Sequence, residues 1–137
     1  MRDSRPILLV EDDTVDAMTV NRALKEINVS NPVVHVKNGE EAIAHLKDPS
    51  TEDPCIILLD LNMPKMNGLE FLEERNQYDE MRIIPTIVLT TSKDEYDKIE
   101  SFKLGIGGYM VKPVDYRQFV EVVRTIDMYW TLSEAVD

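Results

Sequence analysis

The sequence contains little of what marks secreted, membrane-spanning or nucleic-acid-binding proteins. Cys55 is the single cysteine of the sequence, which excludes an internal disulfide and agrees with a reducing, cytoplasmic compartment. No apolar run approaches the roughly 20 residues of a membrane span, and residues 1–6 lack the apolar stretch of a secretory signal. Only 15 Lys and Arg oppose 26 Asp and Glu. Because a net charge of −11 repels phosphate backbones, we expect no nucleic-acid partner. From the lack of a long apolar run we expect no membrane association either.

What is present is the composition of one globular domain. The chain has 137 residues, 43% of them hydrophobic, which is enough for a single core. Five short apolar runs lie at residues 7–10, 33–36, 56–59, 86–89 and 109–111. The first, third and fourth runs are continuous rather than alternating, which favours strands covered on both faces.

Segments with helical periodicity separate these runs. The first has a predicted apolar stripe of Val15, Met18, Ala23, Leu24 and Ile27, and the last has one of Phe119, Val122, Val123, Ile126 and Trp130. Helix N-caps are predicted where a capping residue precedes an acid or amide by three positions, at Asn38, Asn67, Ser92 and Asp115. Gly105 follows Leu104 where a helix C-cap glycine is expected. Strand and helix therefore alternate five times, which predicts an α/β domain with an open parallel sheet and helices on both faces.

Polar side chains follow the predicted strands. The first strand ends in Glu11 and Asp12, the third in Asp60, the fourth in Thr90 and the fifth in Lys112. Because the carboxyl ends of parallel strands meet at one edge, we expect these groups in one small site. Crowded carboxylates without nearby His or Cys suit Mg²⁺. Asp60 is then placed as a nucleophile, with Lys112 and Thr90 as partners of an incoming phosphoryl group.

The ordered set Glu11, Asp12, Asp60, Thr90 and Lys112-Pro113 resembles the receiver domain of two-component response regulators, over about residues 7–130. The resemblance implies a (βα)5 doubly wound, flavodoxin-like fold with strand order 2-1-3-4-5. It further implies that Asp60 accepts a phosphoryl group from the phosphohistidine of a sensor histidine kinase, and that Lys112 binds that group.

The resemblance also assigns the remaining site residues. Asp12 and Asp60 would hold Mg²⁺ directly, with the Asn62 backbone carbonyl, and Glu11 would act through water. Thr90 and Tyr109 would form the switch pair. The Lys112–Pro113 peptide bond is expected to be cis, and Gly68 to serve the turn after the third strand.

Within the family, the chain resembles the stand-alone branch, including regulators that work with bacteriophytochromes. We expect one receiver domain over residues 1–137, an extension of the last helix at about 127–137, and no output domain. Homodimerisation is expected through the end of that helix, including Tyr129 and Trp130. Thr91 is bulkier than the small residue that many receivers carry there, so we expect a longer-lived phosphorylated state.

Other functions on similar sheets fit less well. A haloacid-dehalogenase-like phosphatase needs a second acid two residues after its nucleophile, where this chain has Asn62. A flavodoxin-like flavin carrier would place phosphate beside Glu11, Asp12 and Asp13. A pseudo-receiver that only binds proteins stays open as the alternative to a domain that catalyses its own phosphorylation and dephosphorylation.

Overall fold

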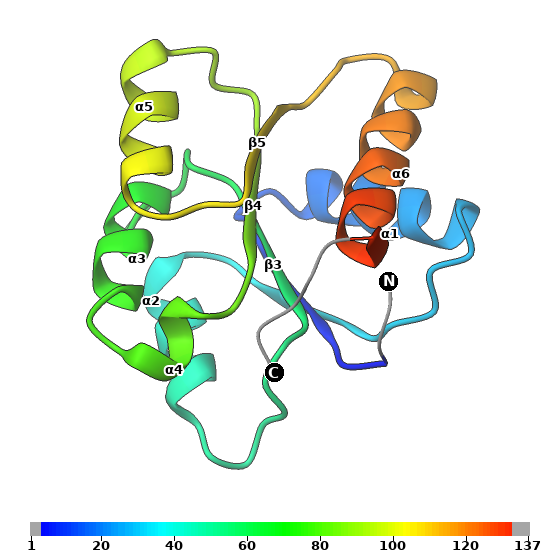
Figure 1. Cartoon of the computed structure of the whole chain (residues 1–137). Coiled ribbons are helices and arrows are strands. Elements are labelled where there is room, and N and C mark those ends of the chain that lie inside the picture. The colour runs from blue at the N-terminus through cyan, green and yellow to red at the C-terminus, as the bar shows by residue number, and fades with distance from the viewer. Residues whose placement is uncertain (1–3, 133–137) are drawn as a thin grey trace.

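The fold is a five-stranded parallel sheet of order β2-β1-β3-β4-β5, seen in a computed structural model that describes residues 4–132 (Figure 1). The strands are β1 (Ile7–Val10), β2 (Val33–Val36), β3 (Ile56–Leu59), β4 (Thr86–Thr90) and β5 (Gly108–Val111). All five coincide with the predicted runs to within one residue, and the α/β class and the strand order are confirmed.

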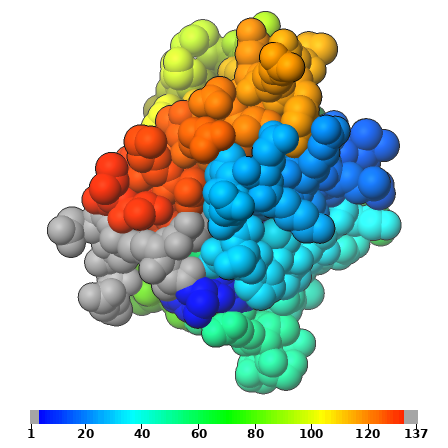
Figure 2. Space-filling view, turned by 90° about the vertical axis from the view of Figure 1, so that its right-hand side faces the viewer, coloured from blue at the N-terminus to red at the C-terminus, as the bar shows by residue number. Residues whose placement is uncertain are grey.

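Helices cover both faces of the sheet (Figure 1). They are α1 (Thr14–Glu26), α2 (Gly39–Lys47), α3 (Gly68–Arg75), α4 (Asp79–Arg82), α5 (Glu95–Lys103) and α6 (Tyr116–Leu132). Helices α1 and α6 lie side by side on one face (Figure 2), and α2, α3 and α5 lie on the other. The short α4 was not predicted, because one turn of helix has no periodicity to detect. Of the expected extension at 127–137, residues 133–137 lie outside the described part of the chain.

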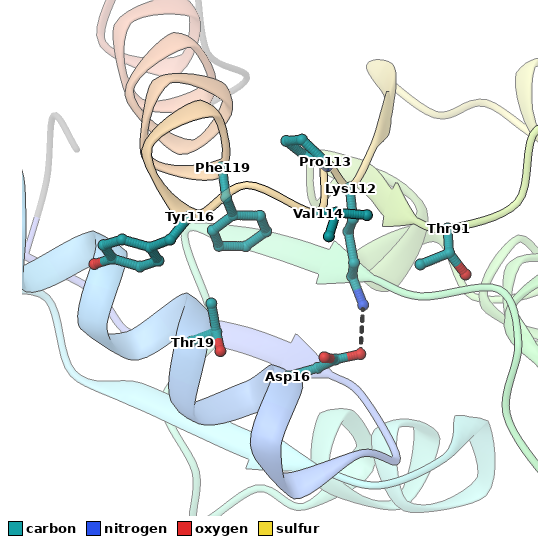
Figure 3. Close-up of a pocket in the computed structure, with 8 residues that line it drawn as sticks. All are labelled: Asp16, Thr19, Thr91, Lys112, Pro113, Val114, Tyr116 and Phe119. Atoms are coloured by element: carbon teal, nitrogen blue, oxygen red, sulfur yellow. Dashed lines mark hydrogen bonds and ion pairs between the residues drawn. The ribbon is translucent and has the colours of Figure 1, made fainter.

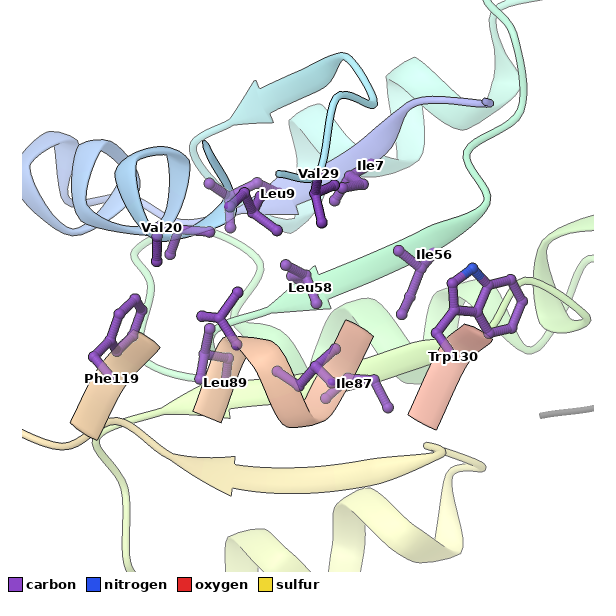
Figure 4. Packing of buried hydrophobic residues seen from close by; sticks show 14 of the residues in the cluster. Ile7, Leu9, Val20, Val29, Ile56, Leu58, Ile87, Leu89, Phe119 and Trp130 are labelled. Carbon is purple, nitrogen blue, oxygen red and sulfur yellow. The ribbon is translucent and has the colours of Figure 1, made fainter. Parts of the chain in front are cut away.

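The continuous apolar runs are explained by two cores, one on each face. Along β1, Ile7 and Leu9 pack toward α1 and α6, whereas Leu8 and Val10 pack toward α2 and α3. Successive strand residues point to opposite faces, so a strand buried on both must be apolar at every position. Figure 4 shows the core under α1 and α6, with Trp130 at one end of it. Trp130 is only 3% exposed, so its expected place in a dimer surface is wrong: the large apolar indole covers its own sheet.

Two predicted helix faces need correction. In α1, Val15 and Met18 are 69% and 65% exposed, and the buried positions are Ala17, Val20, Ala23 and Leu24. The helix carries apolar residues on two faces, and the face with Ala17, Val20, Ala23 and Leu24 packs against the sheet. In α6, Val120 is buried although it lies outside the predicted stripe.

The predicted helix ends are mostly confirmed. Asn38 and Asn67 cap α2 and α3, and Asn67 forms a complete capping box with Glu70. Gly105 has a φ of +90° directly after the C-cap of α5. The predicted cap at Ser92 is wrong, because Asp94 caps α5 instead. Within residues 4–132, no helix has both the length and the apolar character needed to cross a membrane.

Candidate functional site

The candidate site lies at the carboxyl edge of the sheet, where the predicted polar residues meet. Parallel pairing aligns Val10 with Leu59, so that Glu11 and Asp60 follow neighbouring strand ends. Thr90 ends β4 beside Val111, and Lys112 follows β5. The register of the sheet therefore brings four distant parts of the chain to one place.

Three carboxylates form a compact acidic cluster. Glu11, Asp12 and Asp60 each offer an oxygen that lies within 4.8 Å of the others. Asp12 is exposed, whereas Glu11 and Asp60 are buried. Burial raises the pKa of the Glu11 carboxyl to about 7, although the Lys112 ammonium that donates to it acts in the opposite direction. Ionising several crowded carboxyl groups is unfavourable unless a cation lies among them. Carboxylate oxygens are ligands of hard divalent cations, so these residues could hold a metal.

The two oxygens of Asp60 have different surroundings. Oδ1 accepts from the Thr90 hydroxyl at 2.7 Å and from the Asn62 backbone N–H at 3.4 Å. Among the described residues, Oδ2 accepts no hydrogen bond, and its ion partner is the Lys112 ammonium at 3.9 Å. One oxygen therefore orients the carboxylate while the other keeps its lone pairs available.

Lys112 reaches the site as an almost fully buried ammonium. Its side chain is 9% exposed and donates to Glu11 and, at 3.5 Å, to Asp16. Although burial works against it, the contact with Glu11 raises the pKa of Lys112, which keeps the ammonium charged. The expected cis bond to Pro113 is wrong, since residues 4–132 contain no cis peptide bond. An X–Pro bond by itself prefers trans by about 0.5–1 kcal/mol, and the trans chain already brings Lys112 to the acids.

Gly68 permits the tight turn after Asp60, as predicted. A Cβ there would lie 2.6 Å from Leu61 Cδ2 and 2.7 Å from the Asp60 carbonyl oxygen. The Gly68 N–H donates to the Leu61 carbonyl. Only glycine allows α3 to begin directly against the backbone of the Asp60 segment.

A chain of hydrogen bonds joins Asp60 to the surface of β5. The Thr90 hydroxyl that donates to Asp60 accepts from the Ser92 N–H at 3.3 Å, and the half-buried Tyr109 hydroxyl donates to the Ser92 carbonyl at 3.0 Å. Burial raises the pKa of Tyr109, so this hydroxyl stays a donor. The predicted pair Thr90 and Tyr109 is therefore linked through Ser92.

Two contacts were not predicted. Asp16 approaches Lys112 from the first turn of α1, three residues after the N-cap Asp13, and the sequence marks it only as an acid near the start of a helix. His35 Nε2 lies 2.6 Å from the Glu11 carbonyl oxygen at the end of β2. Asp13, by contrast, caps α1 and accepts from the Val15 and Asp16 backbone N–H groups.

Comparisons with known proteins agree with this geometry. A family model described as the response regulator receiver domain matches residues 7–124. Response regulator Rcp1 of Synechocystis sp. is 35% identical over 128 residues, covering 90% of this chain and 87% of its own. The crystal structure of a phosphorylated cyanobacterial phytochrome response regulator, RcpA, superposes with a TM-score of 0.90 at 33% identity and covers 98% of this chain and 100% of its own. The crystal structure of the Mn²⁺-bound form of Rcp1 superposes with a TM-score of 0.86 at 33% identity. The match covers 96% of this chain and 98% of the Rcp1 chain. The chain therefore belongs to the response regulator receiver domain family.

Proposed function

We propose that Asp60 is the phosphoacceptor of this receiver domain and takes its phosphoryl group from a phosphohistidine of a sensor histidine kinase. The observation that carries this assignment is the asymmetry of the Asp60 carboxylate. Oδ1 is held by Thr90, while Oδ2 lies 3.9 Å from the Lys112 ammonium and is otherwise open. A fixed carboxylate with one available oxygen beside a cation has the arrangement that phosphoryl transfer requires.

The transfer follows from these contacts. Oδ2 of Asp60 forms a bond to phosphorus while the bond from phosphorus to the donor's imidazole nitrogen breaks, and the electron pair returns to that nitrogen. The product is an acyl phosphate on Asp60. The Lys112 ammonium is placed to donate to a phosphoryl oxygen, and the Thr90 hydroxyl can leave Oδ1 for another.

The acidic cluster suits Mg²⁺. Asp12 and Asp60 would hold it directly, the Asn62 backbone carbonyl would complete the protein ligands, and Glu11 would act through water. A bound divalent cation would neutralise charge on the phosphoryl oxygens. This assignment is supported by the three oxygens within 4.8 Å of one another and by the Mn²⁺-bound form of the relative Rcp1.

Phosphorylation would shift the equilibrium between two conformations of the domain. If Thr90 turns toward the phosphoryl group, the hydrogen bond from Thr90 to Asp60 is lost and the Ser92 segment is released. Tyr109, which donates to the Ser92 carbonyl, then changes partner and turns inward. The output surface is the face formed by α5, β5 and α6.

The partners follow from the relatives and from the exposed end of α6. Relatives such as RcpA are phytochrome response regulators, so a bacteriophytochrome-type kinase in the cytoplasm is the proposed source of the phosphoryl group. Homodimerisation is proposed through Met128, Tyr129 and Leu132, which are all more than half exposed near the end of α6. In this scheme the domain catalyses only its own phosphorylation and dephosphorylation.

The test is phosphorylation by acetyl phosphate with Mg²⁺, read by intact mass. We expect one phosphoryl adduct on the wild type, none after addition of EDTA, and none on Asp60→Asn. The matched control is Asp79→Asn, which removes an exposed carboxylate in α4 and is expected to leave the adduct intact. No adduct on folded wild-type protein would favour the pseudo-receiver alternative.

A further inference from the structure

The Lys112 ammonium has a third carboxylate beside it that the proposed transfer does not use. Besides Glu11 and Asp60, the Asp16 carboxylate of α1 lies 3.5 Å from Nζ. Figure 3 shows Asp16 and Lys112 facing each other across one end of a pocket between α1 and the segment after β5. The Asp16 side chain is 46% exposed, so its contact with Lys112 lies at the solvent side of the site.

The position of Lys112 relative to Asp60 requires an explanation. A buried ammonium donates to a carboxylate oxygen at about 2.8 Å when nothing opposes the contact, but Nζ stays 3.9 Å from Oδ2. Both side chains are 9% exposed, so solvent screens their attraction little. Nζ instead donates to Glu11 and to Asp16. The contacts made by Lys112 therefore draw the ammonium away from the oxygen that has to react.

We propose that Asp16 is a positioning residue for phosphoryl transfer, which acts through Lys112. Together with Glu11, Asp16 holds the Lys112 ammonium where it can donate to an oxygen of an incoming phosphoryl group. At that position the ammonium is too far from Asp60 Oδ2 to occupy its lone pairs. Without Asp16, Lys112 moves onto Oδ2 and the nucleophile is weakened. This inference rests on the proposed role of Asp60 as phosphoacceptor.

A simpler role for Asp16 makes the opposite prediction. Asp16 is an acid in the first turn of α1, where a negative charge favours the helix dipole. If it were only a surface charge, its removal would make the site less negative and would promote capture of an anionic phosphodonor. The two roles therefore change the phosphorylation rate in opposite directions.

The experiment measures the phosphorylation rate of Asp16→Asn against acetyl phosphate concentration, with Mg²⁺ present. We expect the rate at saturating donor to fall roughly three- to tenfold, while the half-saturating concentration stays equal or falls. Asp16→Glu keeps a carboxylate within reach of Lys112 and is expected to restore most of the rate. Glu95→Gln is the matched control, since Glu95 is also an acid in the first turn of a helix and the residues that the structure describes give it no contact with Lys112.

A second measurement needs neither metal nor turnover. In metal-free protein, the NMR resonance of the Lys112 ε-methylene should shift in Asp16→Asn and keep its wild-type position in Glu95→Gln. An unchanged or higher saturating rate, an equal fall in Glu95→Gln, or an unshifted resonance would each overturn the inference. If wild-type protein forms no adduct, the proposed function fails instead, so the two failures are distinguishable.

Discussion

Replacing Gly68 by Ala should damage both the stability of the fold and the placement of Asp60. An added Cβ would meet Leu61 Cδ2 at 2.6 Å, and the Asp60 carbonyl oxygen and Leu61 Cα at 2.7 Å. Two of these three atoms are backbone, so a rotamer change in a side chain cannot relieve the overlap. Either α3 must move away or the Asp60 segment must shift.

The magnitude follows from two opposing effects. Alanine gains at most about 1 kcal/mol over glycine in a helix, and less at the first helical residue. Overpacking in a filled region costs about 1–3 kcal/mol. We therefore expect Gly68→Ala to lower the free energy of unfolding by about 1–2 kcal/mol. Because misplacement by an ångström can cost up to about 100-fold in rate, we expect phosphorylation by acetyl phosphate to slow roughly tenfold.

The assays are urea denaturation and the initial rate of phosphorylation. The matched control is Gly107→Ala, where a Cβ would lie 3.5 Å from Ile87 Cδ1 and 3.6 Å from the Thr86 carbonyl oxygen. These are ordinary contacts, so this variant should stay within about 0.5 kcal/mol of wild type. Wild-type stability and rate in Gly68→Ala would refute the steric explanation.

Three further predictions concern other parts of the molecule. Arg75 is buried and donates to the Leu104 carbonyl, so Arg75→Ala should lower the free energy of unfolding, measured in urea, by about 2–4 kcal/mol. Arg75→Met should recover part of that loss because it refills the volume, and equal losses in the two variants would contradict this. Thr91→Ala should shorten the lifetime of the phosphorylated state several-fold, measured by loss of the mass adduct, because a smaller side chain admits water; an unchanged lifetime would reject it. Trp130→Ala should lower the free energy of unfolding by about 3–5 kcal/mol. Tyr129→Ala should leave stability unchanged and reduce self-association measured by sedimentation. The reverse pattern would contradict the assignment of Trp130 to the core and Tyr129 to the surface.

The strands and the site could be predicted because their signals are local. A run such as residues 56–59 is apolar at every position because both faces of β3 are covered. Asp60 follows this run directly because β3 ends at the carboxyl edge of the sheet, where the polar residues of the candidate site lie. The meeting of distant residues such as Glu11 and Lys112 then follows from parallel strand order alone.

What could not be predicted depends on how the elements pack. The rotation of α1 about its axis decides that Ala17 and Val20 face the sheet while Val15 and Met18 face solvent, and hydrophobicity alone does not choose between these two apolar faces. That same rotation turns Asp16 toward Lys112. The burial of Val120, which lies outside the predicted stripe of α6, likewise depends on how that helix packs against the sheet.

The most direct test is to find the atom that carries the phosphoryl group. Protein phosphorylated by acetyl phosphate is reduced with borohydride, which converts an acyl phosphate to an alcohol, and its peptides are then sequenced by mass spectrometry. We predict homoserine in place of aspartate at residue 60, only when Mg²⁺ and the phosphodonor are both present. Homoserine at Asp12 or another aspartate, or a stable phosphoester on Thr90 or Thr91, would contradict the assignment of Asp60 as the phosphoacceptor.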